Sequence, residues 1–491
     1  MTKDGLARPR ARAPRGFDDR RAPALRAERG ILQAVAKVYE SFGFEPLETG
    51  ALEYADALGK FLPDAERPNE GVFAVRDEDD EWLALRYDLT APLARFVAEN
   101  WDNLPKPFRR YAYGAVWRNE KPGPGHGRQF MQCDADTVGS AAPEADAEIV
   151  AMAVEGYAAA GLQAGSFVVK INNRKLLSGL LSAGGVVDPN QRLAVLRAVD
   201  KLDRLGVNGV AALLGSGRKD ESGAFTTGAE LAGPAVDSVL AFVEAGRATR
   251  ASTLARLAEV IGGSAEGDEG LLEMASIDKA LAGFGIDKET TVFDPSVVRG
   301  LEYYTGAVFE AQLTGVGLAD PDKAMRFGSI GGGGRYDDLV ARFTGEKTPA
   351  TGFSFGVSRL AAAMAAGGVE TRPSARGPVV IIAVDRSRMA DYFALAGELR
   401  RAGLAAEVYL GASGMRAQMK YADRRVSPAA VILGEDEIAA GTVTIKDLDL
   451  GRALASKVDD NRAWRTDRPG QVTARRADWV LAVRKIVEAG R

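Results

Sequence analysis

The stretch RYAYGAVWRNEKPGPGHGRQFMQCDADTVG, residues 110–139, holds two runs in which apolar and polar residues alternate. Arg110–Glu120 is the first run and Arg128–Gly139 is the second, and such alternation is typical of strands with one buried face. The segment between them, KPGPGHG, consists largely of glycine and proline, which favour turns. The stretch therefore predicts a long antiparallel hairpin with a wide, flexible tip.

Ahead of the hairpin, the sequence predicts one long helix and two strands. Apolar residues recur at helical spacing from Leu25 to Phe42, and Gly43 follows where a helix-ending glycine is expected. The segment FEPLETGALEY, residues 44–54, is interpreted as a strand. Trp82–Thr90 alternates as well, which predicts a strand that leads into a helix with Thr90 as its N-cap.

The rest of the chain changes twice in composition and hydrophobic pattern. After Asn172 it is rich in Ala, Leu and Gly and reads as helical until about Val292. Strands resume at Arg299, Met325 and Ala350, so we expect the first sheet to be completed by chain that returns after a helical insertion. A final segment alternates strands with short helices, as compact α/β domains do. The predicted boundaries are 1–172 and 291–370 for the two parts of the first domain, 173–290 for the insertion, 371–377 for a linker and 378–491 for the last domain.

Composition excludes several classes of function. The chain has 491 residues, a net charge of −4, one cysteine, Cys133, and one histidine, His126. A disulfide and a Cys/His zinc site are therefore excluded, and a Ser/His/Asp triad would need its base in the mobile hairpin tip. Because the net charge does not attract phosphate, any nucleic-acid contact must come from local basic surfaces.

The hydropathy pattern predicts a protein without a membrane span. The longest apolar run near a strand, VVIIAV at residues 379–384, is far shorter than the roughly 20 residues that cross a bilayer. The N-terminus is rich in arginine but lacks an apolar segment, and acidic residues lie among the arginines. We therefore expect a flexible basic lead-in and a cytoplasmic location.

The second hairpin strand carries polar residues on one face. Alternation places Arg128, Phe130, Gln132, Asp134 and Asp136 together, and four residues of strand span roughly 13 Å. Gln132 and Asp136 can therefore reach opposite ends of one small ligand. For this strand alone, the competing interpretation is a solvated polar face.

Two further polar sets are close to the hairpin in sequence. Arg118 lies beside Glu120 at the end of the first strand, and an arginine with nearby acids suits a ligand that carries both phosphate and ammonium. Arg86, Asp88 and Thr90 alternate on the preceding strand, where Asp88 could neutralise an ammonium group. For that strand alone, the competing interpretation is a helix cap at Thr90 and a local partner for Asp88.

The segment RGLEYYTGAVFE, residues 299–310, indicates a third part of a pocket. Arg299 and Gly300 place a permanent cation where the backbone can approach a ligand closely. Along the strand, Tyr304 is expected to share a face with Gly306, whereas Tyr303 faces the other way. Ordinary packing of the tyrosines is the alternative.

Two glycine-containing segments follow. SIGGGGRYDDLV, residues 329–340, has four glycines before Arg335 and Tyr336, but it is not a phosphate loop and is weak support for a dinucleotide fold. TGFSFGVSRLAAAM, residues 351–364, predicts a strand that enters a helix with Arg359 in its first turns. An arginine near a helix N-terminus favours a triphosphate, although a surface arginine is the default explanation.

Taken together, these segments resemble the histidine–tRNA ligase family of class II aminoacyl-tRNA synthetases. VWRNE with RQFMQCDAD resembles the family's motif 2, RGLEYYTGAVFE and SIGGGGRYDDLV its histidine-side segments, and TGFSFGVSRL its motif 3. KYADRR and AAVILGEDEIAAGTVTIKDL resemble its anticodon-binding domain. The resemblance implies an α+β catalytic domain on an antiparallel sheet, a helical insertion, a C-terminal α/β anticodon-binding domain and a homodimer.

The resemblance also implies a reaction. The enzyme would use ATP to activate L-histidine to histidyl-adenylate, with release of pyrophosphate, and would transfer the histidyl group to the 3′ end of tRNA(His). No protein nucleophile is required. Mg²⁺ would bridge the leaving pyrophosphate, and the side chains that hold the ion are left open.

Site residues follow from the resemblance, position by position. The residues implied for histidine are Asp88, Thr90, Arg118, Gln132, Asp136, Arg299, Tyr303, Tyr304 and Tyr336. Those implied for ATP are Arg118, Glu120, Phe130 and Arg359. Asp88, Thr90 and Gln132 would hold the ammonium group, and Asp136 and Tyr304 the imidazole, which has one donor and one acceptor. Arg118 and Arg299 would be catalytic, on two sides of the reacting α-phosphate.

Contacts with tRNA are expected in two places. Arg416, Lys420 and Arg424 recur at i, i+4 and i+8, which puts them on one helix face and suits a polyanion, although a solvated charged face is the alternative. His126 lies in the hairpin tip, where relatives usually have arginine. Gly50 stands where motif 1 normally has proline, and Glu302 replaces an aspartate, so contacts at these positions are expected to differ.

Two rival functions remain at this point. A non-charging regulatory paralogue that senses histidine would lack the anticodon domain and the motif arginines. A tRNA-binding module with an inactive site would not need Arg118, Arg299 and Arg359 together with Asp136 and Tyr304.

Overall fold

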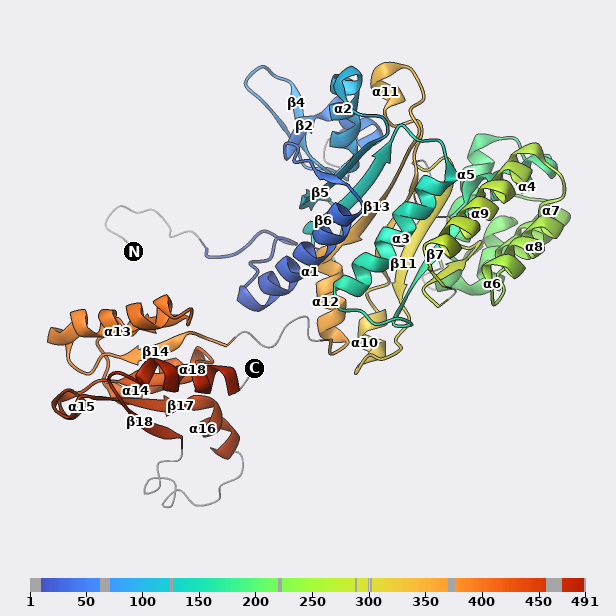
Figure 1. The fold of residues 1–491 in the computed structure, drawn as a ribbon. Coiled ribbons are helices and arrows are strands. Elements are labelled where there is room, and N and C mark those ends of the chain that lie inside the picture. The colour runs from blue at the N-terminus through green and yellow to red at the C-terminus, as the bar shows by residue number, and fades with distance from the viewer. Residues whose placement is uncertain are drawn as a thin grey trace. The chain divides into compact units, whose positions relative to one another are not determined.

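The computed structural model describes residues 10–61, 71–123, 125, 127–219, 223–287, 289–298, 300, 303–369, 376–455 and 470–489. The chain divides into two compact units, Met1–Thr371 and Arg372–Arg491 (Figure 1). His126, Arg299 and Glu302 lie outside the described residues. Within those described residues, no helix has the length and apolar character needed to cross a bilayer.

A sheet of eight strands forms the base of the first unit, in the order β1-β5-β6-β13-β12-β11-β7-β10. Its strands are β1 (Glu45–Pro46), β5 (Phe108–Trp117), β6 (Gln129–Val138), β7 (Phe167–Asn173), β10 (Thr291–Phe293), β11 (Ala307–Leu313), β12 (Ser329–Arg335) and β13 (Ala350–Gly356). The six central strands are antiparallel, and each edge strand pairs in parallel with its neighbour. The predicted antiparallel sheet and the hairpin β5–β6 are thus confirmed.

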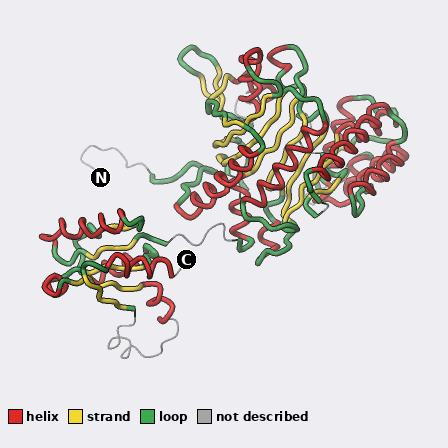
Figure 2. The backbone as a smooth tube through the Cα atoms, viewed as in Figure 1, coloured by secondary structure: helices red, strands yellow, loops and turns green. Residues whose placement is uncertain are grey.

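Helices cover one face of this sheet (Figures 1 and 2). The covering helices are α1 (Ala22–Ser41), α3 (Pro143–Ala159) and α12 (Val357–Ala366). Their apolar sides share one core with the sheet, in which the rings of Tyr157 and Phe355 lie 4.4 Å apart. On the opposite face, α2 (Thr90–Asn100) packs over the β5 end of the sheet with Phe108 and Val138.

The long N-terminal helix ends as predicted, whereas the strand before α2 does not extend as far as expected. Gly43 has φ +80° just after α1, the left-handed conformation that favours glycine. The strand predicted over Trp82–Thr90 stops early, because β4 is Trp82–Leu85. Thr90 is the first residue of α2 rather than its cap, and the Asp88 carboxylate accepts from the backbone N–H groups of Thr90 (3.1 Å) and Ala91 (2.9 Å). Asp88 therefore does the capping that was predicted for Thr90.

Smaller elements complete the first unit. A three-stranded sheet, β2-β4-β3, consists of β2 (Leu52–Tyr54), β4 and β3 (Ala74–Arg76). The 3₁₀ helices are η1 (Ala55–Phe61) and η2 (Trp101–Asn103), and two short helices are α10 (Pro321–Met325) and α11 (Ala341–Thr344). The expected strand over residues 44–54 is therefore split into β1 and β2.

The chain between β7 and β10 forms the helical part of the first unit. Its helices are α4 (Arg174–Ala183), α5 (Pro189–Val199), α6 (Leu202–Leu214), α7 (Gly233–Val243), α8 (Arg250–Ile261) and α9 (Ala265–Gly283). A hairpin of β8 (Gly217–Lys219) and β9 (Phe225–Thr227) lies between α6 and α7. The sequence pattern did not predict this hairpin, because three residues per strand are too few to show alternation.

The second unit has a five-stranded sheet in the order β15-β14-β16-β17-β18. Its strands are β14 (Val379–Ile382), β15 (Ala406–Val408), β16 (Ala429–Ile432), β17 (Thr442–Asp447) and β18 (Gln471–Arg475). Its helices are η3 (Arg386–Arg388), α13 (Met389–Arg401), α14 (Met415–Arg424), α15 (Glu435–Ala440), α16 (Leu448–Ala455) and α18 (Trp479–Ala489). The first three strands are parallel, which confirms the predicted α/β fold.

Candidate active site

A cavity of about 500 Å³ lies on the face of the large sheet that carries Gln132 and Asp134. It lies over β6, β12 and β13 and is bounded by the segment before α2, the end of β5 and the segment before β11. Its lining residues are Tyr87, Asp88, Thr90, Arg118, Gly125, Phe130, Gln132, Asp134, Gly300, Tyr303, Tyr304, Ser329, Ile330, Gly331, Gly332, Ser354, Gly356 and Arg359.

The floor of the cavity is polar and buried. Gln132 and Asp134 are 8% and 2% exposed, and the predicted alternation along β6 does place them on one face. In the register with β13, Asp134 stands opposite Ser354 and Gln132 opposite Gly356. Gln132 Oε1 and Asp134 Oδ1 have no hydrogen-bond partner among the described residues. Buried polar atoms in this state are available to a ligand.

Asp136 lies behind the cavity wall in a buried ionic cluster. Its Oδ2 is 2.9 Å from Arg110 Nη2, with the two side chains 3% and 1% exposed, and the Tyr336 hydroxyl donates to its Oδ1. Arg110 Nη2 also donates to the Leu89 carbonyl at 2.9 Å, just ahead of α2. Burial raises the pKa of Asp136, and Arg110 and the Tyr336 hydroxyl oppose that rise. A Cβ at Gly352 would lie 2.0 Å from Asp136 Oδ1, so this position requires glycine.

Arg118 stands between two aromatic rings at the other end of the cavity. Its Cζ is 4.2 Å from the ring centre of Tyr87 and 5.2 Å from that of Phe130, and its Nε donates to the Tyr87 carbonyl at 3.4 Å. The rings hold the guanidinium by cation–π contact and leave its other N–H groups for an anion. Glu120 lies nearby, because its Oε1 accepts from the Tyr87 hydroxyl at 3.2 Å.

The two adjacent tyrosines both face the cavity. Tyr303 and Tyr304 contact each other with ring centres 5.4 Å apart and both line the cavity. The prediction that Tyr303 faces the other way is therefore wrong, because β11 begins only at Ala307 and the tyrosines lie in a turn without strand alternation. At Gly300, φ is +67° and a Cβ would lie 2.4 Å from the Tyr304 ring. Glycine there lets the ring pack on the backbone.

Arg174, the first residue of α4, ties this turn to the helical part of the unit. Its Nη2 donates to the Gly300 carbonyl at 2.8 Å, and its backbone N–H donates to the Gly306 carbonyl at 2.9 Å. The side chain is 8% exposed, and burial lowers its pKa to about 10. The helix α4 therefore fixes both ends of the tyrosine turn.

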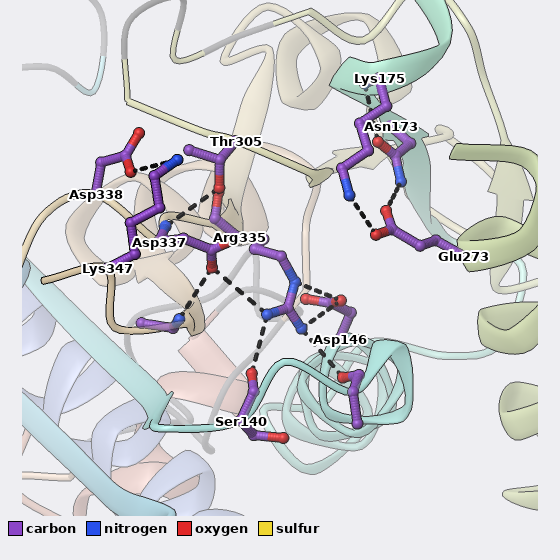
Figure 3. A network of polar contacts seen from close by, with 12 residues as sticks. Ser140, Asp146, Asn173, Lys175, Glu273, Thr305, Arg335, Asp337, Asp338 and Lys347 are labelled. Atoms are coloured by element: carbon purple, nitrogen blue, oxygen red, sulfur yellow. Dashed lines mark hydrogen bonds and ion pairs between the residues drawn. The ribbon is translucent and has the colours of Figure 1, made fainter. Parts of the chain in front are cut away.

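Arg335 supports the same turn from below (Figure 3). Its guanidinium donates to Asp146 at 2.8 and 3.0 Å and to the carbonyls of Ser140 (2.9 Å) and Ala142 (3.1 Å). Its own carbonyl accepts from the Thr305 N–H at 2.8 Å. Arg335 points away from the cavity, so it holds the framework together rather than binding a ligand.

Arg359 approaches the cavity from the first turn of α12. Its Nη1 donates to the Ser329 carbonyl at 2.9 Å, at the start of β12. The strand β13 that runs into a helix carrying Arg359 matches the prediction from sequence. Arg118 and Arg359 thus bring two cations to one cavity.

The predicted basic stripe lies in the second unit. Arg416, Lys420 and Arg424 are exposed on α14, while Gln418 and Ala422 on its other face are buried. The stripe is therefore solvent-accessible along the length of the helix.

The structure brings most of the predicted histidine and ATP residues together. Those that line the cavity are Asp88, Thr90, Arg118, Phe130, Gln132, Tyr303, Tyr304 and Arg359. Asp136 and Tyr336 lie directly behind it, and Glu120 is linked to it through Tyr87. Arg110 and Arg174 were missed, because their roles depend on strand register and on long-range contacts that show no local pattern.

Comparisons with known proteins agree with this geometry. A family described as histidyl-tRNA synthetase matches residues 16–360, and one described as anticodon binding domain matches residues 378–463. The histidine–tRNA ligase of Caulobacter vibrioides is 68% identical over 98% of this chain and 97% of its own length. That of Cereibacter sphaeroides is 54% identical over 99% and 100%. The crystal structure of histidyl-tRNA synthetase from Nostoc sp. PCC 7120 superposes with a TM-score of 0.74 at 27% identity, over 97% of this chain and 100% of the other.

Proposed function

Because the chain belongs to the histidyl-tRNA synthetase family, we propose that the cavity on the large sheet is where histidine and ATP react. The chain is a ligase that charges tRNA(His) with histidine, with ATP as the other substrate. The observation that supports the proposed site most strongly is the convergence of Arg118 and Gln132, both from the hairpin, with Tyr304, from a distant part of the chain, on one cavity.

Histidine binds over the polar floor. Gln132, Asp88 and Thr90 hold the α-ammonium group, since the first two offer oxygen acceptors beside the cavity. Asp136 and Tyr304 bind the imidazole, with Tyr303 packed against Tyr304. The Tyr336 hydroxyl and Arg110 fix the Asp136 carboxylate so that it presents an acceptor to the ring. An amino acid without these ring groups leaves them unpaired, at roughly 1–3 kcal/mol each.

ATP occupies the end of the cavity that carries the arginines. The adenine ring stacks on Phe130, with Arg359 on the opposite side and Glu120 at its edge. Arg118 binds the α-phosphate from one side as the histidine carboxylate attacks, and Arg299 binds it from the other. Cationic side chains placed at the phosphorus would stabilise the negative charge that develops there.

Mg²⁺ fits this site as a companion of the nucleotide. No group of three or more His, Cys, Asp or Glu side chains suited to a metal occurs among the described residues. Mg²⁺ is commonly held by substrate phosphates with one or two carboxylates, so the phosphates of ATP would supply most of the ligands of the ion. When bound, the ion neutralises charge on the leaving pyrophosphate.

The tRNA contacts and the assembly complete the proposal. Residues 378–491 act as the anticodon-binding domain, with Arg416, Lys420 and Arg424 on the phosphate backbone. Residues 173–290 are an insertion in the catalytic domain, and His126 in the hairpin tip contacts the acceptor end. A homodimer is proposed because the chain belongs to the histidyl-tRNA synthetase family, and the resemblance to this family implies one. We assign the enzyme to the cytoplasm.

The regulatory alternative is not favoured, because the anticodon-binding segment is present at residues 378–463 and the arginines Arg118 and Arg359 line the cavity. The test is histidine-dependent exchange of pyrophosphate into ATP, measured on the wild type, on Arg118→Ala and on Arg299→Ala. We expect each variant to lose about 10²–10³-fold in rate.

Arg109→Ala is the matched control for this test, because Arg109 lies on β5, the strand that leads to Arg118, and pairs with Glu148 away from the cavity. It should exchange nearly as fast as the wild type. Exchange without histidine, or a full rate in Arg118→Ala, would contradict the proposed site.

A further inference from the structure

Asp134 has no role in the function proposed above, yet it occupies the centre of the cavity floor. Its side chain is buried, it lines the cavity, and Oδ1 has no hydrogen-bond partner among the described residues. A buried, unpartnered carboxyl oxygen is costly unless a ligand supplies its partner. We therefore expect a ligand in the cavity to form a hydrogen bond with Asp134.

Strand geometry places Asp134 under the bound amino acid. Gln132, Asp134 and Asp136 alternate on the same face of β6, and residues two apart on a strand are separated by about 6.6 Å. A histidine with its ammonium at Gln132 and its ring directed to Asp136 must cross Asp134. The ring end of the substrate therefore lies within reach of this carboxyl.

The surroundings of Asp134 decide its protonation state. Several charged and titratable groups interact electrostatically with Asp134. They are Asp136 and Cys133 on β6, Arg110 on β5, Arg86 and Asp88 before α2, Tyr39 on α1 and Tyr304 before β11. Burial, and then the charge of Asp136, raise the pKa of Asp134 to about 8, against the opposing effects of Arg110 and the nearby Ser354 hydroxyl.

The two neighbouring acids are thus not equivalent. Arg110 and the Tyr336 hydroxyl both contact Asp136 directly, and both stabilise its ionised form. Two carboxyls this close do not both ionise easily, so the proton resides on Asp134 at neutral pH. One acid then offers an acceptor and the other a donor, which is the pair that a neutral imidazole requires.

We propose that Asp134 is a further specificity-determining residue, which binds the histidine side chain in its protonated form and donates a hydrogen bond to the ring nitrogen that carries no proton. The proposal rests on the function proposed above and assigns the single lone pair of that nitrogen to Asp134, on the sheet side of the ring, in place of the Tyr304 hydroxyl on the turn side. A deprotonated Asp134 would instead turn a lone pair toward that nitrogen.

The test is the KM for histidine in pyrophosphate exchange, measured from pH 6 to pH 9.5 on the wild type, Asp134→Asn and Asp134→Leu. We expect Asp134→Leu to raise this KM at least tenfold at pH 7 while the KM for ATP changes less than threefold. Asp134→Asn, which keeps an N–H donor of the same shape, should stay at least threefold below Asp134→Leu.

The pH profile distinguishes a proton donor from a structural residue. The ratio of the wild-type KM to the Asp134→Asn KM should be flat below pH 8 and rise toward tenfold per pH unit above it, because only the wild type loses its donor. Taking the ratio cancels the titration of free histidine. A flat ratio over the whole range, or a wild-type KM in Asp134→Leu, overturns the proposal.

Failure of the site proposal would look different. If the wild type shows no histidine-dependent exchange, the proposed function itself fails, whatever the Asp134 variants do. A second outcome is that the wild type shows histidine-dependent exchange, with Tyr304→Phe raising the KM for histidine and Asp134→Leu leaving it unchanged. In that case the donor is Tyr304 and the Asp134 assignment is overturned.

Discussion

Replacing Arg110 with methionine should lower the free energy of unfolding of the first unit far more than a substitution at an exposed position of the same hairpin would. The side chain is 1% exposed, it pairs with Asp136 at 2.9 Å, and it is a hydrogen-bond donor to the Leu89 carbonyl. Methionine fills much of the volume but leaves a carboxylate buried without its cation. Removing one partner of a buried ion pair costs about 3–5 kcal/mol, and the orphaned Leu89 carbonyl adds about 1 kcal/mol.

Arg109→Met is the matched control. Arg109 is the preceding residue, its side chain is 38% exposed, and it pairs with Glu148 at 3.1 Å. A half-exposed pair of this kind is worth about 0–1 kcal/mol. The same substitution at adjacent positions should therefore differ by about 3 kcal/mol or more in the free energy of unfolding.

Hydrogen exchange of the β5 and β6 amides, followed by mass spectrometry, is the assay, because it reports the unfolding of the first unit alone. The double variant Arg110→Met, Asp136→Leu replaces the ion pair by apolar groups and should recover most of the lost stability. It should still lack histidine-dependent exchange of pyrophosphate, because the Asp136 carboxylate is absent. Equal losses in Arg110→Met and Arg109→Met, or a double variant less stable than Arg110→Met, would refute this reasoning.

Three further outcomes are expected. Gly352→Ala should raise the KM for histidine at least tenfold, because the new methyl group would lie 2.0 Å from Asp136 Oδ1; a wild-type KM would contradict the close contact. The free energy of unfolding of Asp134→Asn, relative to that of the wild type, should increase as pH rises from about 4 to about 8 and stay constant above pH 8. Urea unfolding at several pH values measures this difference. The raised pKa of Asp134 means that the folded wild type keeps a proton which the unfolded chain releases, so the wild type loses stability in that window. Lys420→Glu on α14 should lower kcat/KM for tRNA charging several-fold without changing pyrophosphate exchange, whereas Lys485→Glu on α18 should change neither.

Local patterns were sufficient to predict the main elements. The alternation over residues 110–139 gives the hairpin β5–β6, and the strand–helix junction around Arg359 follows from a similar pattern. The face of β6 that carries Gln132 and Asp134 was also predictable, because a regular strand has a fixed period of two.

What could not be predicted depends on register and on distant contacts. The pairing of Arg110 with Asp136 requires the register of the hairpin, which a long connection rich in glycine and proline does not determine from sequence. Tyr336 and Asp136 are 200 positions apart, so their hydrogen bond leaves no sequence signal. The orientation of Tyr303 was mispredicted because a turn at Gly300 replaces the strand that alternation suggested.

The most direct test of the central claim is a crystal structure with a non-hydrolysable analogue of histidyl-adenylate. The account predicts density in the cavity on the large sheet, with the phosphate mimic within about 3 Å of the Arg118 guanidinium and the imidazole over β6 between Gln132 and Asp136. Density for the analogue at any other place, with this cavity empty, would contradict the account.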